Sequence, residues 1–232
     1  MARHQIVTGH PKADPAIAAE LAQYGSATVH EAMGRIGYAG HRIRPIQQGA
    51  AIAGTAVTVR CAPGDNLMIH AAIEQAGEGD VVVVVPTTDS AFGFIGELMA
   101  TQLQVRGVRG YVTSGGVRDT DELRRMGFPV WTKFVAAEGT VKDTAGSVNV
   151  PVVLEGTTVE PGDIVVADDD GVTIVPRRLA AEALAASKAR AEREAAARAR
   201  YYDGEISMDV NGLRPVFESL GIEYVAYEGP AE

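Results

Sequence analysis

The sequence lacks the features that mark several large classes of protein. Its single cysteine, Cys61, allows no disulfide within the chain, and there is no cysteine cluster to hold zinc. The longest apolar run, Val81–Val85, is far too short to cross a bilayer, and residues 1–15 lack the uninterrupted apolar segment of a signal peptide. We therefore predict a cytoplasmic protein with no membrane partner.

An excess of basic residues is also missing. The formal net charge of −9 argues against nucleic acid as the main partner. A small acidic substrate is still compatible with this charge, because a local arginine pocket can work inside an acidic protein. No Gly-x-Gly-x-x-Gly follows an apolar run, which argues against a nucleotide or methyl-donor site.

The 232 residues suffice for one sizeable core, and 46% of them are hydrophobic. Thr55–Arg60 alternates in polarity, which predicts a half-buried strand. Residues 64–127 then read as helix, strand, helix, strand, helix, an order that implies parallel strands with crossover helices. Further short strands are expected at Val130–Phe134, Val150–Leu154, Ile164–Ala167 and Val172–Val175. The last two of these form a predicted hairpin.

The composition changes sharply at Pro176, which divides the prediction into a core, residues 1–176, and a C-terminal helical arm with a tail, residues 177–232. The segment Leu179–Tyr201 is rich in alanine, arginine and glutamate and predicts one long helix. Because no large aliphatic side chain follows Leu184 in this helix, it would bury little area alone. We expect the arm to pack on a neighbouring subunit of a homo-oligomer.

Two glycine-containing turns bound the region with the most chemistry. In the first, Gly93 and Gly96 precede a helical pattern whose first amides lack intrahelical acceptors. Such amides, at the positive end of the helix dipole, bind carboxylates. The alternative is that the glycines only turn the chain and that Glu97 offsets the dipole.

The second turn, Ser114–Asp119, also lies between a predicted strand and a predicted helix. Here Asp119 is an N-cap candidate that Glu122 would complete as a capping box, which would leave Arg118 as surface charge. The functional alternative depends on pairing the two turns, because loops after consecutive parallel strands emerge at one sheet edge. Arg118, Asp119 and free amides at that edge predict a site for a 2-oxo acid with Mg²⁺, which commonly takes one or two protein carboxylates.

Gly-Glu-Leu-Met-Ala at 96–100, followed by Gly-Gly-Val-Arg-Asp at 115–119, resembles the RraA-like family. The closer likeness is to its class II branch, the 4-hydroxy-4-methyl-2-oxoglutarate/4-carboxy-4-hydroxy-2-oxoadipate aldolases. Residues 63–66, 170–172 and 212–215 extend the likeness over most of the chain. The resemblance implies an α/β, three-layer β/β/α swivelling fold with a C-terminal helical arm. It also implies a homotrimer or homohexamer with sites at subunit interfaces.

The same resemblance implies roles for particular residues. Arg118 would contact the C2 oxygen of a 2-oxo acid, and Asp119 would bind the divalent metal, Mg²⁺ or Mn²⁺. Glu97, and Glu194 from a neighbouring subunit, would orient metal-bound water. Glu31 matches another site carboxylate, although it also has capping-box spacing from Thr28. The substrate carboxylate would be held by the amides of Gly96, Glu97, Leu98 and Met99.

Together these roles imply a metal-dependent aldolase that cleaves 4-carboxy-4-hydroxy-2-oxoadipate, or 4-hydroxy-4-methyl-2-oxoglutarate, to pyruvate and a second 2-oxo acid. Oxaloacetate would lose CO₂ through the same enolate, as a second activity. Two alternatives stay open: a non-catalytic RraA-like regulator of ribonuclease activity, and a dedicated oxaloacetate decarboxylase. We interpret Lys133, in a predicted strand, and His70, on a predicted helix, as structural residues rather than as a Schiff-base former and a ligand.

Overall fold

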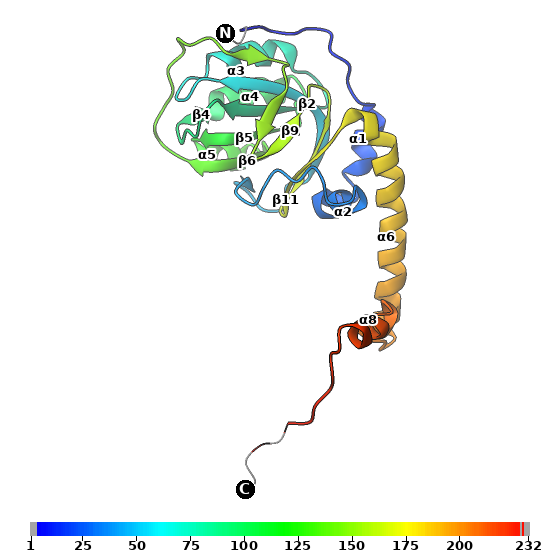
Figure 1. Ribbon diagram of the computed structural model, residues 1–232. Coiled ribbons are helices and arrows are strands. Elements are labelled where there is room, and N and C mark those ends of the chain that lie inside the picture. The colour runs from blue at the N-terminus through cyan, green and yellow to red at the C-terminus, as the bar shows by residue number, and fades with distance from the viewer. Residues whose placement is uncertain (1–3, 228, 230–232) are drawn as a thin grey trace. The chain divides into compact units, whose positions relative to one another are not determined.

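The computed structural model describes residues 4–227 and 229 (Figure 1). The chain divides into two compact units, residues 1–188 and residues 189–232, and the helix α6 (Ala180–Tyr202) contributes to both. Among the described residues, no helix is both long and apolar enough to span a membrane.

The first unit contains a mixed sheet of nine strands and a separate two-stranded hairpin. The strands are β1 (Arg44–Pro45), β2 (Ile52–Cys61), β3 (Asp80–Pro86), β4 (Gly93–Ile95), β5 (Gly110–Val117), β6 (Val130–Val135), β7 (Ser147–Val148), β8 (Val152–Leu154), β9 (Thr157–Val159), β10 (Ile164–Asp168) and β11 (Gly171–Val175). The main path of the large sheet is β1-β6-β5-β3-β2-β10-β11, while β4 pairs with β5 and β7 with β2. The central strands β2, β3, β5 and β6 run parallel to one another, which confirms the predicted crossover arrangement.

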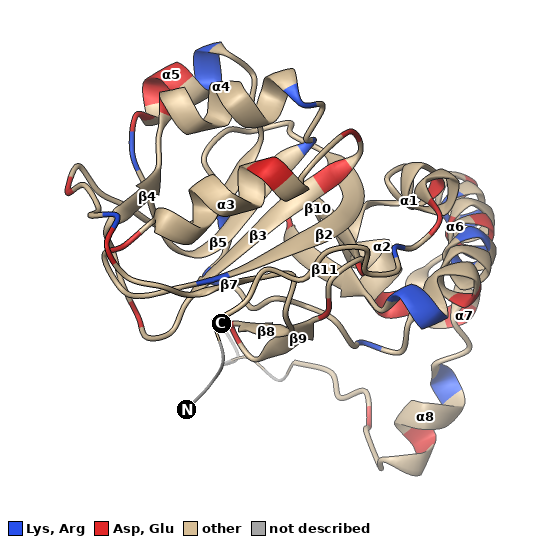
Figure 2. Ribbon diagram, turned by 90° about the horizontal axis from the view of Figure 1, so that it is seen from above, with Lys and Arg blue, Asp and Glu red and all other residues tan. Residues whose placement is uncertain are grey.

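The helices cover the sheet unequally. They are α1 (Pro15–Leu21), α2 (Gly25–Ala32), α3 (Leu67–Gln75), α4 (Glu97–Val105), α5 (Thr120–Arg125), the 3₁₀ helix η1 (Arg177–Leu179), α6, α7 (Ser207–Val210) and α8 (Arg214–Ser219). Helices α3, α4 and α5 lie on one face of the sheet, and the β8–β9 hairpin lies on the other (Figure 2). The resulting order of hairpin, sheet and helices is the expected β/β/α layering.

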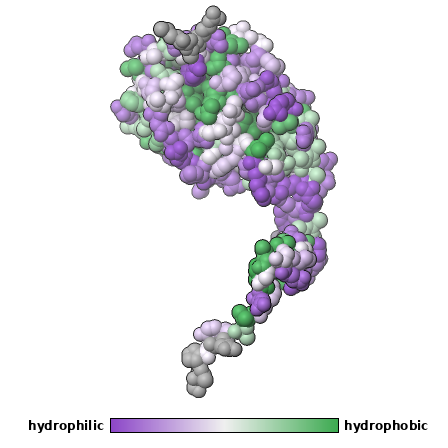
Figure 3. All heavy atoms as spheres, viewed as in Figure 1, coloured by the Kyte–Doolittle hydropathy of each residue, from purple (hydrophilic) through white to green (hydrophobic). Residues whose placement is uncertain are grey.

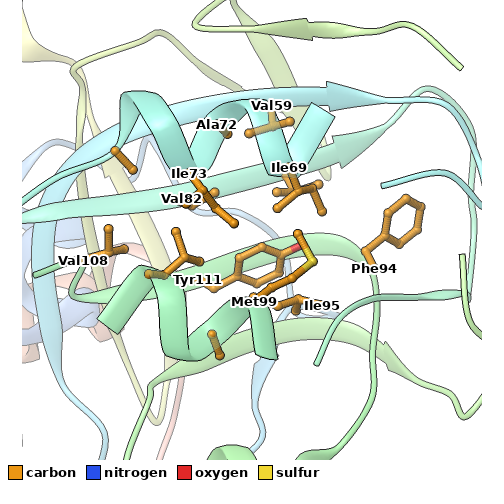
Figure 4. Packing of buried hydrophobic residues seen from close by; sticks show 14 of the residues in the cluster. Val59, Ile69, Ala72, Ile73, Val82, Phe94, Ile95, Met99, Val108 and Tyr111 are labelled. Carbon is orange, nitrogen blue, oxygen red and sulfur yellow. The ribbon is translucent and has the colours of Figure 1, made fainter. Parts of the chain in front are cut away.

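Side-chain alternation along β3 explains these layers. Val82 and Val84 pack with α3 and α4, whereas Val81 and Val83 pack with the β8–β9 hairpin, and all four are fully buried. A continuous β-branched run therefore suits a strand that is covered on both faces. Figure 4 shows part of the helix-side cluster, in which Met99 lies beside the ring of Tyr111.

Two predictions about strands were wrong in detail. The strand predicted at 55–60 is buried on both faces, and its Thr58 is satisfied there by a 2.6 Å hydrogen bond from its hydroxyl to the carbonyl of Val150. Residues Ser114–Val117 are the end of β5 rather than a turn, because Gly116 and Val117 pair with the short strand β4 and with β6. The predicted hairpin is confirmed: β10 and β11 are antiparallel, with Asp168 opposite Gly171.

The second unit exposes most of its apolar side chains. Helices α7 and α8 contain no buried residue among those described, and the apolar residues at the surface of α8 are visible in Figure 3. Leu213 is 38% exposed, Val216 48% and Leu220 68%. Burial within this single chain therefore does not account for these side chains.

Candidate functional site

A cavity of about 250 Å³ lies where β4 and β5 end and α4 and α5 begin. Strand β4 delivers Gly96 to its wall, and β5 delivers Arg118 and Asp119, so the two regions singled out in the sequence do meet. This is the sheet edge at which loops after parallel strands converge. The lining residues are Asn66, His70, Gly93, Phe94, Gly96, Leu98, Met99, Gln102, Arg118, Asp119, Thr140 and Lys142.

The carboxylate of Asp119 is turned toward α4 rather than toward its own helix. Its Oδ2 accepts the backbone N–H of Glu97 at 3.1 Å, and it makes no capping bond to α5. The alternative of a capping box with Glu122 is therefore wrong. Asp119 also has φ of +54°, a left-handed conformation that costs a non-glycine residue about 1 kcal/mol. The chain thus adopts a strained backbone at Asp119, which lines the cavity and whose carboxylate bonds to α4.

The side chain of Arg118 packs closely against three glycines, Gly93, Gly96 and Gly139. An added Cβ at Gly93 would lie 2.9 Å from the Cβ of Arg118, and one at Gly139 would lie 3.1 Å from its Nη1. An added Cβ at Gly96 would lie 3.2 Å from the Cγ of Arg118 and would overlap the carboxylate of Asp119. The glycines are therefore needed for the close approach of these two side chains, whose Nε and Oδ2 are 3.7 Å apart.

The start of α4 offers donors to the cavity. The amides of Glu97, Leu98 and Met99 have no intrahelical acceptor, and among these three only the N–H of Glu97 has an acceptor in the described part of the protein. Leu98 and Met99, which follow Glu97, both line the cavity. The free amides and the dipole of α4 make this end of the cavity suitable for a carboxylate.

The three predicted glutamates lie in different surroundings. The carboxylate of Glu97 accepts the hydroxyl of Thr101 at 3.3 Å, and Glu97 is absent from the cavity lining. Glu31 does not line the cavity either, and pairs with Arg35 at 3.0 Å. Since Thr28 lies inside α2, the alternative of a capping box from Thr28 to Glu31 is wrong.

Glu194 belongs to the second unit of the chain. It lies on α6, where its carboxylate pairs with Arg190 of the preceding turn at 2.8 Å. Its predicted role depends on a neighbouring subunit and stays a prediction.

The donor set of the cavity fits one kind of metal ion. Among the described residues there is no group of three or more histidine, cysteine or acidic side chains placed to hold a metal, as a closed zinc site would require. Asp119 is 40% exposed at its side chain, and only its Oδ2 is engaged by the described part of the protein. A single open carboxylate suits Mg²⁺ or Mn²⁺, which keep several waters and take substrate oxygens as ligands.

One part of the cavity wall, formed by the start of α3 and a loop, was missed by sequence reasoning. Here Asn66 and His70 stand four residues apart at the start of α3, and Thr140 and Lys142 come from an irregular loop. Asn66 Oδ1 and His70 Nε2 are buried with no hydrogen-bond partner in the protein. Burial, and then the charge of Lys142, lower the pKa of His70, which keeps this ring neutral. This part of the cavity wall thus combines the positive charge of Lys142 with two buried polar atoms, Asn66 Oδ1 and His70 Nε2, that lack a hydrogen-bond partner among the described residues.

Of these four residues, only Asn66 and His70 could have been grouped from the sequence. Asn66 and His70 share a helix face by their i, i+4 spacing, so the structural interpretation of His70 is incomplete. Lys133, in contrast, lies outside the cavity lining, with its amino group 2.7 Å from Asp89 and 3.1 Å from Glu155. Burial works to lower the pKa of Lys133, but the hydrogen bonds to these two carboxylates outweigh it and raise the pKa. A protonated, paired lysine is unsuited to forming a Schiff base.

Comparison with known proteins places this site in context. A protein of Halalkalibacterium halodurans, named "Putative 4-hydroxy-4-methyl-2-oxoglutarate aldolase", is 31% identical over 179 residues, which cover 77% of this chain and 82% of that protein. A Burkholderia multivorans protein of the same name is 35% identical over 57% of this chain and 80% of its own length.

Among solved structures, Streptomyces coelicolor RraAS2, described as an unusual member of the RNase ES inhibitor RraA protein family, superimposes with a TM-score of 0.72 at 27% identity. The superposition covers 82% of this chain and all of that one. Residues 26–174, which include the whole cavity lining, match the family model described as "RraA-like: Aldolase/RraA". The chain therefore belongs to the RraA-like family.

Proposed function

We propose that the protein is a divalent-metal-dependent aldolase that releases pyruvate from a 4-hydroxy-2-oxo acid bearing a second carboxylate. The observation that carries the proposal is the meeting of Arg118, Asp119 and the amino end of α4 at one cavity. The name shared by the two aligned relatives supports the same reaction class. The substrates that fit are 4-carboxy-4-hydroxy-2-oxoadipate and 4-hydroxy-4-methyl-2-oxoglutarate.

The near end of the cavity would bind the 2-oxo acid part of the substrate. The free amides of Leu98 and Met99, together with Gly96, would hold the C1 carboxylate at the positive end of α4. The guanidinium of Arg118 would donate to the C2 oxygen, because the side chain lines the cavity and is packed closely against Gly93, Gly96 and Gly139. Asp119 would hold the metal ion close to the same oxygen.

Cleavage of the C3–C4 bond requires a place for the electron pair that leaves it. That pair moves onto the 2-oxo acid fragment as a pyruvate enolate, while the C4 hydroxyl loses its proton and becomes the carbonyl of the second product. Protonation of the enolate at C3 then gives pyruvate. Arg118 would stabilise the developing oxyanion from a fixed position, as preorganised donors do. When bound, a divalent ion would supply Lewis acidity toward the same oxygen.

Removal of the C4 hydroxyl proton needs a base, and we assign the positioning of this base to carboxylates. Glu97 and another subunit's Glu194 would hold the water that accepts this proton, with Glu31 as a further site carboxylate. This assignment requires the arm to pack on a neighbouring subunit in a homotrimer or homohexamer. The exposed apolar residues of α8 support an assembly contact for the arm.

The part of the cavity wall that contains His70, Thr140 and Lys142 would bind the carboxylate of the substrate that lies beyond C4. Lys142 supplies the positive charge, and Thr140 supplies a hydroxyl donor. Neutral His70 offers its Nε2, which has no hydrogen-bond partner in the described part of the protein. We expect Lys142→Met to raise KM for both aldol substrates about tenfold, the loss of one charge-assisted hydrogen bond, with kcat little changed.

Decarboxylation of oxaloacetate is the expected second activity, since it passes through the same enolate. The test is a coupled assay of pyruvate release from both aldol substrates and from oxaloacetate, before and after removal of divalent metal. Activity lost with EDTA and restored by Mg²⁺ or Mn²⁺ supports the proposal. Turnover of oxaloacetate alone would identify a dedicated decarboxylase, and no turnover of any substrate would favour a non-catalytic ribonuclease regulator.

A further inference from the structure

The loop that carries Thr140 and Lys142 has little apolar anchorage of its own. We call residues 139–144 the cavity loop. Val141, its one large aliphatic residue, is 57% exposed. Its position at the cavity must therefore come from hydrogen bonds rather than from burial of apolar area.

At its start the loop is bridged to Gly93 of β4, which donates its N–H to the carbonyl of Glu138 at 2.7 Å. The bonds to the rest of the loop come from one short segment, residues 64–66, in front of α3. The N–H of Val141 donates to the carbonyl of Gly64 at 2.9 Å, and the carbonyl of Val141 accepts the N–H of Asn66 at 3.0 Å. Between these two lies Asp65, whose backbone pairs with Val141 as an isolated bridge. The loop is thus fastened to the same segment that supplies Asn66 to the cavity.

The side chain of Asp65 is the main anchor. It is only 2% exposed, and its Oδ2 accepts the N–H groups of Asp143 and Thr144, each at 2.7 Å. Its Oδ1 accepts the N–H of Leu67 at 2.8 Å, at the start of α3. One buried carboxylate therefore ties the end of the cavity loop to the helix that carries His70.

The charge of this carboxylate is sustained by its donors. Burial works to raise the pKa of Asp65, but the N–H groups of Leu67, Asp143 and Thr144 and the hydroxyl of Thr144 outweigh it and lower the pKa. An amide in its place would keep the size of the group but would turn an N–H₂ toward the donors at one of the two oxygens. The anchor thus needs a carboxylate, because backbone donors meet both of its oxygens and an amide has only one acceptor atom.

We propose that Asp65 is a positioning residue for substrate specificity: it holds the cavity loop so that Thr140 and Lys142 face the second carboxylate of the substrate. The nature of that ligand rests on the proposed function, whereas the anchoring of the loop does not. Asp65 itself does not line the cavity. Its effect on turnover would therefore pass through the loop.

The chain offers a matched control in Asp163. This carboxylate is 3% exposed, accepts the backbone N–H groups of Glu160 and Arg177 at 2.9 Å each, and does not line the cavity. Asp163→Asn removes a buried acceptor of two backbone N–H groups without moving the cavity loop, although burial raises the pKa of Asp163 whereas hydrogen bonds lower that of Asp65. Thr144→Val is a milder change at the anchor, since it removes only the hydroxyl donor, and it serves if Asp65→Asn fails to fold.

The experiment combines amide hydrogen exchange with kinetics on the full-length protein. For Asp65→Asn we expect the amides of Asp143 and Thr144 to exchange at least about tenfold faster than in the wild type, as a local opening would allow. We expect KM for 4-hydroxy-4-methyl-2-oxoglutarate to rise about tenfold with kcat nearly unchanged. Inhibition by oxalate, which mimics the enolate and lacks the part of the substrate that bears the second carboxylate, should be unchanged, and Asp163→Asn should leave both KM and loop exchange at wild-type values.

Three outcomes would overturn the inference. Faster exchange with an unchanged KM would make Asp65 a purely structural anchor. Equal effects of Asp65→Asn and Asp163→Asn on KM would assign the effect to general destabilisation. Unchanged exchange would remove the anchor altogether. If the wild type turns over no aldol substrate, the proposed function fails separately, and the exchange measurement still decides whether Asp65 holds the loop.

Discussion

The Oδ2 atom of Asp119 accepts the backbone N–H of Glu97 at 3.1 Å, across a gap of 22 residues in the sequence. This bond joins the end of β5 to the start of α4, and so connects the two halves of the cavity wall. Asp119 makes it from a left-handed backbone conformation that a glycine would adopt without strain. A residue that is costly for the fold but faces the cavity is expected at a functional site.

Substitutions of Asp119 should separate stability from function. Asp119→Ala and Asp119→Gly both remove the carboxylate, so both should lower turnover at least about 100-fold. The glycine variant relieves the positive φ and should be more stable than the alanine variant by about 1 kcal/mol. Urea denaturation and pyruvate release measure the two effects. Retained turnover in either variant would show that the carboxylate acts only in the fold.

The close approach at Gly96 gives a second prediction. Gly96→Ala would press a methyl group against the carboxylate of Asp119, so metal-dependent turnover should fall at least about tenfold. Gly77→Ala is the matched control, because a Cβ there meets no atom within 4 Å and its φ is not positive. That variant should keep full activity and gain about 0.5 kcal/mol of stability. Equal activity of the two alanine variants would contradict the role assigned to Gly96.

Some strands could be predicted from the sequence and others could not, and the difference has a physical cause. The parallel core was predictable because Val81–Val85 is a β-branched run buried on both faces. Strand β4 was not, because its three residues Gly93–Ile95 have no periodicity and become a strand only by pairing with Gly116 and Val117. Local patterns cannot report a pairing that tertiary structure creates.

The same distinction applies to the site. Arg118 and Asp119 were predictable because they follow a strand at the edge where parallel strands end. Thr140 and Lys142 were not, since their loop is held by Asp65, which bonds to Asp143 from 78 residues away. The capping-box spacing of Asp119 and Glu122 pointed to the wrong partner, because the carboxylate bonds across to α4 instead.

Acid should weaken the fold through His70. Its pKa is lowered from the ordinary value of 6.5 by burial and by the charge of Lys142. Between the lowered pKa and 6.5 the unfolded chain binds a proton that the folded chain does not, so the free energy of unfolding falls as pH falls through this window. The urea midpoint should therefore decrease from about pH 7.5 to about pH 5.5.

The variant His70→Gln isolates this contribution, because His10 also has a lowered pKa and acts in the same direction. We expect the urea midpoint of the variant to decrease less than that of the wild type over the same pH range. An equal decrease in the two proteins would mean that His70 is not the responsible group.

Shared sites between subunits can be tested by mixing inactive variants. Asp119→Ala and Glu194→Ala should each be inactive alone, since one lacks the metal ligand and the other the arm carboxylate. If Glu194 acts on another subunit, co-refolded mixtures should recover about a quarter of the wild-type activity, because a site then needs two intact contributions drawn at random. Light scattering checks that both variants keep the wild-type assembly. No recovery in a normally assembled mixture would place Glu194 outside its neighbour's site.

If Arg118 and Asp119 stabilise a pyruvate enolate with a divalent ion, the protein should exchange the methyl protons of pyruvate for deuterium. Proton NMR of pyruvate in D₂O measures this exchange without knowledge of the natural substrate. We predict exchange by the wild type with Mg²⁺ or Mn²⁺, loss of exchange on addition of EDTA, and no exchange by Asp119→Ala. Exchange that persists in Asp119→Ala, or its absence in the metal-loaded wild type, would show that this site does not stabilise the enolate.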